Sequence, residues 1–362
     1  AARGAVFGAA YGWERPNWFA DAPGAETVDS FARTNWFEPV ARECAAVRDR
    51  VGLSDMSVFS KFDLAGPDIT PFLEALGANR APKPGRIGLT HALTPAGGVL
   101  SEFTVTRLGA DQAYLTSAAA AEEIDLDVLQ ACAADFDVTV SNVTDDVAVI
   151  GVMGPRAADV LPELADMPWL SARNATLAGA PVRALRLSYI GEAGWELHVA
   201  ADRAATLFTV LEERAQPHGL GFYGAYAAIS MRLEKGYRGW GSDLTTERSP
   251  IEAGLAPFVR PEVRDELLTE DPWAMVLLEI EAGEIDPFYA HTLWRADQPV
   301  GIVTSGAYGH RTDKVLALAY LRDTAARTDL SVSILGQHRA ARILTEPPFD
   351  PDSTRMKSGG QT

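Results

Sequence analysis

The sequence predicts an α+β fold with antiparallel sheets, divided into two or three packed subdomains. The 362 residues exceed the size at which one hydrophobic core usually keeps growing. Apolar residues make up 47% of the chain and charged residues 22%, which supplies material for several cores. Short β-rich runs and amphipathic helices follow one another without the strict strand–helix alternation that a parallel sheet requires.

The first elements can be located by their periodicity. Residues 1–30 are rich in aromatic residues and glycine but have no helical period, so we expect an ordered arm that lies over the body. Apolar residues recur at helical spacing over 37–51, with charges between them, which predicts an amphipathic helix. Gly52 ends this helix, alternation predicts a strand over 57–66, and a second helix is expected over 67–78.

The middle of the chain continues with strands and helices that are expected to form two lobes over 31–265. Residues 88–117 contain two β-rich runs with turn signals at 95–98 and 109–111, which predicts a meander. A helix is expected from about 119 to 134. The further expected elements are strands within 137–154, a helix over 155–164, strands over 182–190 and 196–200, and a helix over 201–216.

The C-terminal part has a different composition. Residues 257–273 are rich in charge and proline, and short strands with turns between them fill most of 275–356. This pattern predicts a small β-barrel or a sandwich. The last dozen residues, and 357–362 above all, are expected to fray.

The charge of the chain limits its partners. A formal net charge of -17 and a pI of about 4.8 would repel phosphate backbones and anionic lipid, so nucleic acid and membrane surfaces are poor candidates. No apolar stretch approaches the roughly 20 residues needed to span a bilayer, and no targeting signal is visible. We expect a cytoplasmic protein, or one of the mitochondrial matrix if the source is eukaryotic.

Common catalytic signatures do not occur in the sequence. There is no nucleophile elbow, zinc-protease motif, P-loop or clustered His/Cys set, which argues against hydrolysis by a triad or a metal. Cys44 and Cys132 are isolated, so neither a metal site nor a disulfide is expected. The dinucleotide fingerprint is missing too, and we therefore expect no flavin bound within this chain.

Three unusual stretches remain. A Gly-Gly turn precedes a strand that carries Glu102, whose carboxylate either is solvated on an exposed face or faces a pocket. A Gly-rich turn separates Glu192 from Glu196, with Tyr189 alongside; this could equally be a plain hairpin with an exposed acid. Residues 231–255 are dense in glycine, aromatic residues and charge without a period after residue 236, which is typical of a functional loop.

These stretches belong to an ordered set that covers nearly the whole chain. The set is GWERPNWFA, ECAAVRDRVGLSDMSVFSKFDLAGP, GGVLSEFTV, GVMGPRAADVL, SYIGEAGWELHV, RLEKGYRGWGSDLTTERSPIEAGL and VTSGAYGH. It resembles the glycine cleavage T-protein family, and more closely the folate-binding C-terminal region of dimethylglycine and sarcosine dehydrogenases and of dimethylglycine oxidase. The resemblance implies a three-lobed cloverleaf with folate in a central channel and a C-terminal β-barrel.

The resemblance also implies roles for individual residues. Glu196 matches the carboxylate that pairs with the pterin edge, whereas Glu192 is expected to be structural. Glu102 matches an Asp near the folate nitrogens, and its implied catalytic role is to orient and to stabilise a cationic iminium or protonated amine. The implied apolar or stacking walls of the folate site are Phe59, Leu89, Tyr189 and Trp240. The implied cations for the glutamate tail are Arg355 and, less directly, Lys61, Arg238 and His310.

The implied activity is tetrahydrofolate-dependent one-carbon transfer from an N-methylated or aminomethyl substrate, or from a formaldehyde equivalent. Ala228 and Ala118 stand where the T-protein has Arg and Asn, which favours the dehydrogenase branch over glycine cleavage. A flavin-dependent dehydrogenase domain or subunit is the implied partner. The alternatives are a stand-alone demethylase, a glycine-cleavage aminomethyltransferase, a non-catalytic folate-binding or assembly module, and a module that docks a partner through an arm around Trp13 and Trp18.

Overall fold

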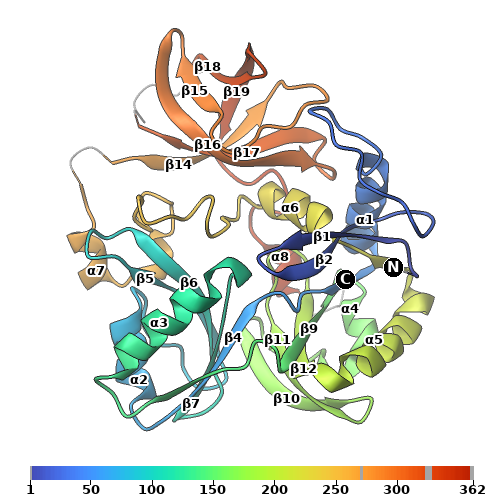
Figure 1. Cartoon of the computed structure of the whole chain (residues 1–362), viewed down its shortest axis with the longest axis vertical. Coiled ribbons are helices and arrows are strands. Elements are labelled where there is room, and N and C mark those ends of the chain that lie inside the picture. The colour runs from blue at the N-terminus through green and yellow to red at the C-terminus, as the bar shows by residue number, and fades with distance from the viewer. Residues whose placement is uncertain (1, 270–271, 323–327, 359–362) are drawn as a thin grey trace.

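The computed structural model describes residues 2–269, 272–322 and 328–358. It has three lobes arranged around a central helix, α6 (Ala225–Glu234), with the C-terminal barrel at the top of Figure 1. We call the two lower lobes lobe 1, which contains strands β3 and β9 to β13, and lobe 2, which contains strands β4 to β8. The predicted α+β class with antiparallel sheets is confirmed.

The N-terminal arm is a two-stranded hairpin, β1 (Ala5–Ala10) and β2 (Trp13–Phe19). It packs against α6 and against α1 (Phe37–Asp49), the helix predicted over 37–51. The Glu43 carboxylate of α1 accepts backbone N–H bonds from Phe19 at 2.6 Å and from Gly224 at 2.8 Å, so one side chain joins the hairpin to the start of α6. Trp18 is 2% exposed and lies in the core, which contradicts an arm that offers this side chain to a partner.

Lobe 1 is a six-stranded sheet in the order β10-β11-β12-β9-β3-β13. Its pairs are antiparallel except for β3 and β13, which are parallel. Its strands are β3 (Val51–Asp55), β9 (Val147–Met153), β10 (Ser171–Leu177), β11 (Ala180–Arg186), β12 (Gly194–Ala200) and β13 (Leu220–Phe222). Helices α4 (Ala157–Val160) and α5 (Ala201–Ala215) cover the apolar face of this sheet.

The helix predicted over 155–164 is wrong in its length. The structure has only one turn of α-helix, α4, followed by a 3₁₀ turn, η2 (Pro162–Leu164). Pro162 has no backbone N–H and therefore cannot continue the hydrogen bonding of α4. Strands β3, β10 and β13 were not predicted from the sequence. Of these, β10 carries polar residues on its exposed positions and β13 is only three residues long.

Lobe 2 is a five-stranded antiparallel sheet in the order β5-β6-β7-β4-β8, with two helices on one face. Its elements are β4 (Ser60–Ala65), α2 (Ile69–Leu76), β5 (Ile87–Leu93), β6 (Val99–Arg107), β7 (Gln112–Ser117), η1 (Ala119–Ala121), α3 (Glu122–Ala133) and β8 (Thr139–Asn142). The predicted meander and both predicted helices are confirmed. Because β3 precedes these elements and β9 follows them, lobe 2 is inserted between two paired strands of lobe 1.

The C-terminal lobe is a closed barrel in the strand order β14-β17-β16-β15-β18-β19, which confirms the barrel prediction. Its strands are β14 (Ala274–Ile280), β15 (Thr292–Arg295), β16 (Gln298–Gly309), β17 (Lys314–Leu321), β18 (Leu330–Ile334) and β19 (Gln337–Leu344). Two 3₁₀ turns and a short helix lie outside the sheets: η3 (Gln216–His218), η4 (Ala256–Phe258) and α7 (Pro261–Glu266). Buried aliphatic residues of alternate positions fill the barrel, as expected for a small closed sheet.

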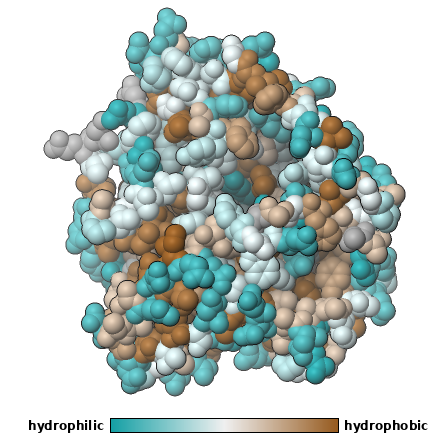
Figure 2. All heavy atoms as spheres, viewed as in Figure 1, coloured by the Kyte–Doolittle hydropathy of each residue, from teal (hydrophilic) through white to brown (hydrophobic). Residues whose placement is uncertain are grey.

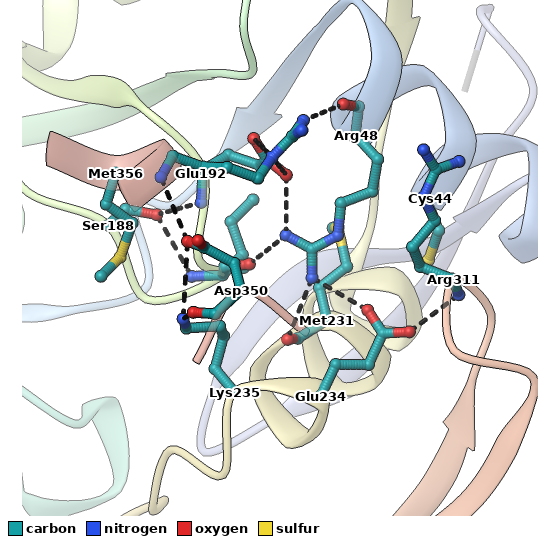
Figure 3. Close-up of polar contacts among 12 residues, drawn as sticks. Cys44, Arg48, Ser188, Glu192, Met231, Glu234, Lys235, Arg311, Asp350 and Met356 are labelled. Atoms are coloured by element: carbon teal, nitrogen blue, oxygen red, sulfur yellow. Dashed lines mark hydrogen bonds and ion pairs between the residues drawn. The ribbon is translucent and has the colours of Figure 1, made fainter. Parts of the chain in front are cut away.

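The expectation that the last dozen residues fray is wrong for its first part. Helix α8 (Thr354–Lys357) lies there, and residues 359–362 lie outside the described residues. The helix is held because Arg355 Nε contacts both Glu192 carboxylate oxygens at 2.9 Å. Glu192 also contacts Arg48, whose guanidinium lies between Glu192 and Glu234 (Figure 3).

The surface is mixed in polarity. Figure 2 shows teal, pale and brown side chains interspersed over this face, with brown, apolar ones gathered over lobe 2 and at the top over the barrel; Ile124 of α3 is 47% exposed. Within 2–269, 272–322 and 328–358, no helix combines the length and apolar character needed to cross a membrane.

Candidate functional site

Each of the two lower lobes has one apolar sheet face and one polar sheet face. In lobe 2, Phe62, Phe103 and Leu115 pack into the core with α2 and α3. Side chains alternate along a strand, and directly paired residues share a face, so the strand register defines the opposite face. That polar face carries Lys61, Leu89, His91, Glu102, Tyr114 and Thr116.

Lobe 1 follows the same rule. Trp195, Leu197 and Val199 of β12 lie in the core of the lobe. The alternate residues Glu196 and His198 therefore lie on the other face of β12. In the register, Gly151 of β9 lies opposite Glu196, and Arg183 of β11 lies opposite His198.

The two polar faces contact each other. The Tyr114 hydroxyl of lobe 2 lies 2.9 Å from His198 Nδ1 of lobe 1. The Arg183 guanidinium lies 4.1 Å from the centre of the Tyr114 ring, and its Nη1 donates to Asp63 Oδ1 at 3.0 Å. Glu196 is thus placed at the junction of the two lobes.

Glu196 is a buried carboxylate with few donors. The residue is 4% exposed, and within the described chain its one ion-pair contact is His198, whose Nε2 lies 3.5 Å from Oε2 and forms no hydrogen bond. Burial lowers the pKa of His198; Glu196 opposes this, and the positive charge of Arg183 adds to it. A neutral imidazole beside a buried carboxylate leaves that carboxylate able to accept further N–H groups.

Glu102 has a different setting. It lies opposite His91 on adjacent strands, and His91 Nε2 is 3.0 Å from Glu102 Oε2. The His91 side chain is 0% exposed, whereas that of Glu102 is 22% exposed. A buried ring therefore fixes a carboxylate whose other oxygen can meet a ligand.

The loop over 236–256 packs against the start of β6. Trp240 Nε1 donates to the Leu100 carbonyl at 3.1 Å, and the Tyr189 hydroxyl donates to the Arg238 carbonyl at 2.6 Å. Gly98 is required here, because a Cβ atom at this position would collide with the carbonyl of Thr246. These contacts bring the predicted wall residues Tyr189 and Trp240 to the same region as the Glu102 strand.

The remaining predicted residues are more dispersed. Phe59 lies half-buried in the turn between β3 and β4, and Leu89 lies half-buried on the polar face of lobe 2. Arg238 donates to the carbonyls of Ala253 and Gly236; burial lowers its pKa, and Glu102 is among the acids that oppose this. Its guanidinium is therefore near the site but already hydrogen-bonded.

Three predicted cations have other contacts. Lys61 is buried, donates to the Ser57 carbonyl at 2.7 Å and lies 5.6 Å from the Trp13 ring; burial lowers its pKa to about 8. Burial lowers the pKa of His310 to about 4, so this ring is neutral at pH 7 and does not supply a cation. Arg355 contacts Glu192 and the carbonyl of Arg48, which places it in the cluster around Arg48 (Figure 3).

The two positions that depart from the T-protein pattern carry small side chains. Ala118 precedes η1 at the end of β7, and its carbonyl accepts the Ser60 hydroxyl at 3.2 Å. Ala228 lies on α6, half-buried against the core between α6, α1 and the N-terminal hairpin. Neither side chain can donate a hydrogen bond to a ligand.

His91, His198 and Tyr114 were not predicted as site residues from the sequence. For His198 a signal was available, because a residue two positions after Glu196 shares its face of a strand. For His91 the signal was weaker, since pairing with Glu102 depends on the register of a hairpin that contains a bulge. Tyr114 could not be found, because its contact with His198 crosses between two sheets.

Surface depressions of about 350 Å³ and about 450 Å³ lie beside the N-terminal hairpin. Phe7 lines both, and neither is lined by Glu102 or Glu196. The candidate site therefore rests on the chemistry of the lobe junction and not on these depressions.

Known proteins that resemble this chain show its family. The family model of the GCVT N-terminal domain matches residues 1–262, and that of the glycine cleavage T-protein C-terminal barrel domain matches 274–350. Mitochondrial dimethylglycine dehydrogenase of Mus musculus is 35% identical over 375 residues, which cover 97% of this chain and 43% of that protein. The chain thus spans less than half the length of this relative.

Shorter relatives match over most of their length. Aminomethyltransferase of Thermus thermophilus is 32% identical over 328 residues, covering 87% of this chain and 91% of that protein. The crystal structure of glycine cleavage system aminomethyltransferase T from Bartonella henselae shares the fold, with a TM-score of 0.83, 23% identity and coverage of 96% and 95% of the two chains. On the two family models and these relatives, the chain belongs to the glycine cleavage T-protein family of folate-dependent aminomethyltransferases.

Proposed function

We propose that this chain binds tetrahydrofolate at the junction of lobes 1 and 2 and transfers to it a one-carbon unit from an N-methylated amine. The observation that carries the proposal is Glu196, a carboxylate that is 4% exposed and whose single described ion-pair contact is His198, 3.5 Å away and not hydrogen-bonded to it. A buried carboxylate is costly unless donors meet it. The amino-pyrimidinone edge of a pterin offers adjacent N–H donors that suit both carboxylate oxygens.

The other site residues fit this arrangement. Tyr189 and Trp240, held by hydrogen bonds to backbone carbonyls, would flank the ligand, with Phe59 and Leu89 as further apolar walls. For the glutamate tail, Arg355 is the candidate cation, because 36% of its side chain stays exposed while Nε contacts Glu192.

The proposed mechanism needs no protein nucleophile. The chemistry that tetrahydrofolate supplies when bound is a set of amine nitrogens able to take up the carbon. Glu102, held in place by His91 at 3.0 Å, puts a fixed negative charge where positive charge develops on the reacting amine. Glu196 aligns tetrahydrofolate, which takes up the carbon, by binding its pterin edge. The chain thus contributes orientation and electrostatic stabilisation.

The donor is inferred from the relatives. Those above 30% identity over nearly the whole chain include dimethylglycine dehydrogenase and 4-methylaminobutanoate oxidase (formaldehyde-forming), and this chain covers 43% and 45% of their lengths. We therefore propose a small N-methylated amino acid as the source of the carbon. The partner is a flavin-dependent dehydrogenase domain or subunit that oxidises this amine.

A glycine-cleavage aminomethyltransferase is the second candidate, supported by the Thermus thermophilus relative, of which the chain covers 91%. Against it stand Ala118 and Ala228, whose side chains cannot donate hydrogen bonds. A non-catalytic folate-binding module is the third candidate; it would bind folate but would not depend on Glu102.

Calorimetric titration with tetrahydrofolate tests the proposal. We expect the wild type to bind with a Kd of micromolar order, and Glu196→Gln to bind about tenfold to a hundredfold more weakly, because a hydrogen bond to a charged group is worth about 1.5–3 kcal/mol. Glu163→Gln is a matched control, since Glu163 pairs with Arg214 on the surface. A wild type that does not bind would refute the function, and equal binding by Glu196→Gln would refute the site.

A further inference from the structure

Glu196 does not stand alone at the lobe junction. Three buried groups form a line across it: the Glu196 carboxylate, the His198 imidazole and the Tyr114 hydroxyl, which are 4%, 3% and 0% exposed as residues. His198 Nδ1 forms a 2.9 Å hydrogen bond with the Tyr114 hydroxyl, and His198 Nε2 lies 3.5 Å from Glu196 Oε2, where it has no hydrogen-bond partner among the described residues. The first two groups belong to β12 of lobe 1, and the third belongs to β7 of lobe 2.

The protonation states of the three groups determine which atom carries each proton. Burial raises the pKa of Tyr114, so its hydroxyl keeps its proton. Burial lowers the pKa of His198, so its ring is neutral and has one N–H. The ionised Glu196 carboxylate can only accept, so the ring proton belongs on Nε2, facing Glu196, and Nδ1 is left to accept from the Tyr114 hydroxyl.

We infer that His198 is a positioning residue for folate recognition, in which Tyr114 fixes the ring tautomer and the Nε2–H group holds the Glu196 carboxylate toward the pterin edge. The inference rests on the proposed function. A carboxylate whose orientation is already fixed loses less freedom when the ligand binds than a carboxylate that rotates freely. A residue that contacts Glu196, and not the ligand, therefore affects the affinity for the ligand. Because these three groups come from both lobes, the Glu196 carboxylate points toward the pterin edge only when lobes 1 and 2 are packed against each other.

The groups around this line support the assignment. The Arg183 guanidinium lies over the Tyr114 ring at 4.1 Å and is paired with Asp63 at 3.0 Å, so its charge is fixed beside the phenol. Leu185 lies opposite Glu196 on β11, and Gly151 lies opposite it on β9. Neither of the neighbours that the register gives Glu196 on these two strands has a polar side chain. Two polar groups from elsewhere lie near it: His198, and Tyr223, whose pKa is raised by burial and by the charge of Glu196.

The test combines two variants of His198 and one of Tyr114, all in the full chain, titrated with tetrahydrofolate in a calorimeter. His198→Leu removes the donor, and we expect Kd to rise about tenfold to a hundredfold. His198→Gln keeps an N–H group near the position of Nε2, and we expect Kd to return to within about threefold of the wild type. Tyr114→Phe leaves the tautomer unfixed, and we expect an intermediate loss.

His218→Leu is the matched control, because His218 belongs to the same lobe but contacts Arg156 on the surface. We expect its Kd to equal that of the wild type. Thermal melting of each variant separates loss of folding from loss of binding. If His198→Leu does not fold, the comparison of Tyr114→Phe with the wild type decides.

Nitrogen NMR of ¹⁵N-histidine-labelled protein gives a readout that does not depend on folate. We expect His198 to be neutral with its proton on Nε2 at pH 7, and the proton to redistribute between the two nitrogens in Tyr114→Phe. A proton on Nδ1 in the wild type would overturn the inference.

The outcomes also separate this inference from the proposed function. If the wild type binds tetrahydrofolate and His198→Leu binds it equally well, the positioning role is wrong and the function stands. If the wild type does not bind, the proposed function fails, and the recognition role of His198 fails with it.

Discussion

Glu102 is the residue on which the proposed chemistry depends, and the structure gives it a fixed geometry. It is held by one hydrogen bond from a fully buried imidazole, while part of its side chain is exposed. A carboxylate of this kind can stabilise developing positive charge without having to reorganise. Its predicted contribution therefore concerns turnover and not ligand affinity.

The Glu102→Gln variant should bind tetrahydrofolate within about threefold of the wild type but transfer carbon about a hundredfold more slowly, since loss of one preorganised electrostatic group costs about 10²–10³ in kcat. The measurement follows ¹³C from labelled sarcosine into folate by NMR, with an added flavin-dependent dehydrogenase and subtraction of the protein-free rate. Asp166→Asn, on the surface, serves as the control. Undiminished transfer would leave only a folate-binding role for the chain.

For single residues, only part of the candidate site could be predicted from the sequence. Glu196 and Glu102 were predicted because they match motifs, their roles stay predictions, and the place of His198 on the same strand face as Glu196 could have been inferred from strand alternation. The cationic role suggested for His310 was wrong, because burial among Phe37, Tyr308 and Arg33 cannot be predicted from a local motif. Contacts between lobes depend on packing, and a single sequence does not specify which side chains meet there.

Among the elements, α3 carries an unexpected buried charge. Asp125 in its first turn is 0% exposed, and burial raises its pKa to about 6. The hydroxyls of Ser101 and Ser117 oppose this rise, although neither they nor the Asp125 oxygens form a hydrogen bond of good geometry within the described residues. Packing α3 on its sheet therefore costs free energy, because it buries the Asp125 carboxylate, and this cost depends on pH.

Asp125→Asn should make the protein more stable above pH 6 by up to about 2–3 kcal/mol, at 1.36 kcal/mol per pKa unit. The folded carboxyl binds its proton more tightly than the unfolded one, whose pKa is about 3.9, so wild-type stability falls as pH rises from about 4 to 6. Urea unfolding at pH 4, 5, 6 and 7 measures this. A difference between variant and wild type that stays constant with pH would contradict the prediction.

The elements themselves were predicted well where their patterns are long and regular. Helix α1 and the barrel strands have clear periodicity, and both were located correctly. Errors occurred where a tertiary contact decides the structure: Pro162 ends a helix early, and α8 is ordered because Glu192 binds Arg355. Strand β13, with three residues, is too short to show alternation and depends on pairing with β3.

At the scale of the whole molecule, the cluster around Arg48 joins the parts of the chain. Arg48 of α1 contacts Glu192, before β12, and Glu234, at the end of α6; all three side chains are at most 1% exposed. Glu234 also accepts the backbone N–H groups of Arg311 and Thr312 from the barrel. One guanidinium thus connects lobe 1, the central helix and the barrel.

Arg48→Leu should lower the free energy of unfolding by about 3–5 kcal/mol, because it leaves two buried carboxylates without their shared cation. The control is Arg173→Leu, which removes a surface pair with Asp166 and should change stability by less than about 1 kcal/mol. Chemical denaturation measures both variants. If the two lose the same stability, the cluster does not connect the lobes energetically.

The insertion of lobe 2 into lobe 1 has a consequence for how a ribosome must produce this protein. Strand β3 leaves the exit tunnel before lobe 2, but its neighbours β9 and β13 are made only after the whole of lobe 2 has been synthesised. Lobe 2 is continuous in sequence and can collapse while β3 is still unpaired, and Met56 and Val149, joined by a 2.8 Å backbone hydrogen bond, mark where its two ends must meet. The nascent chain therefore carries β3 without either neighbour until β9 is made and with one open edge until β13 is made, and lobe 2 must be folded before the junction that holds Glu196 can close.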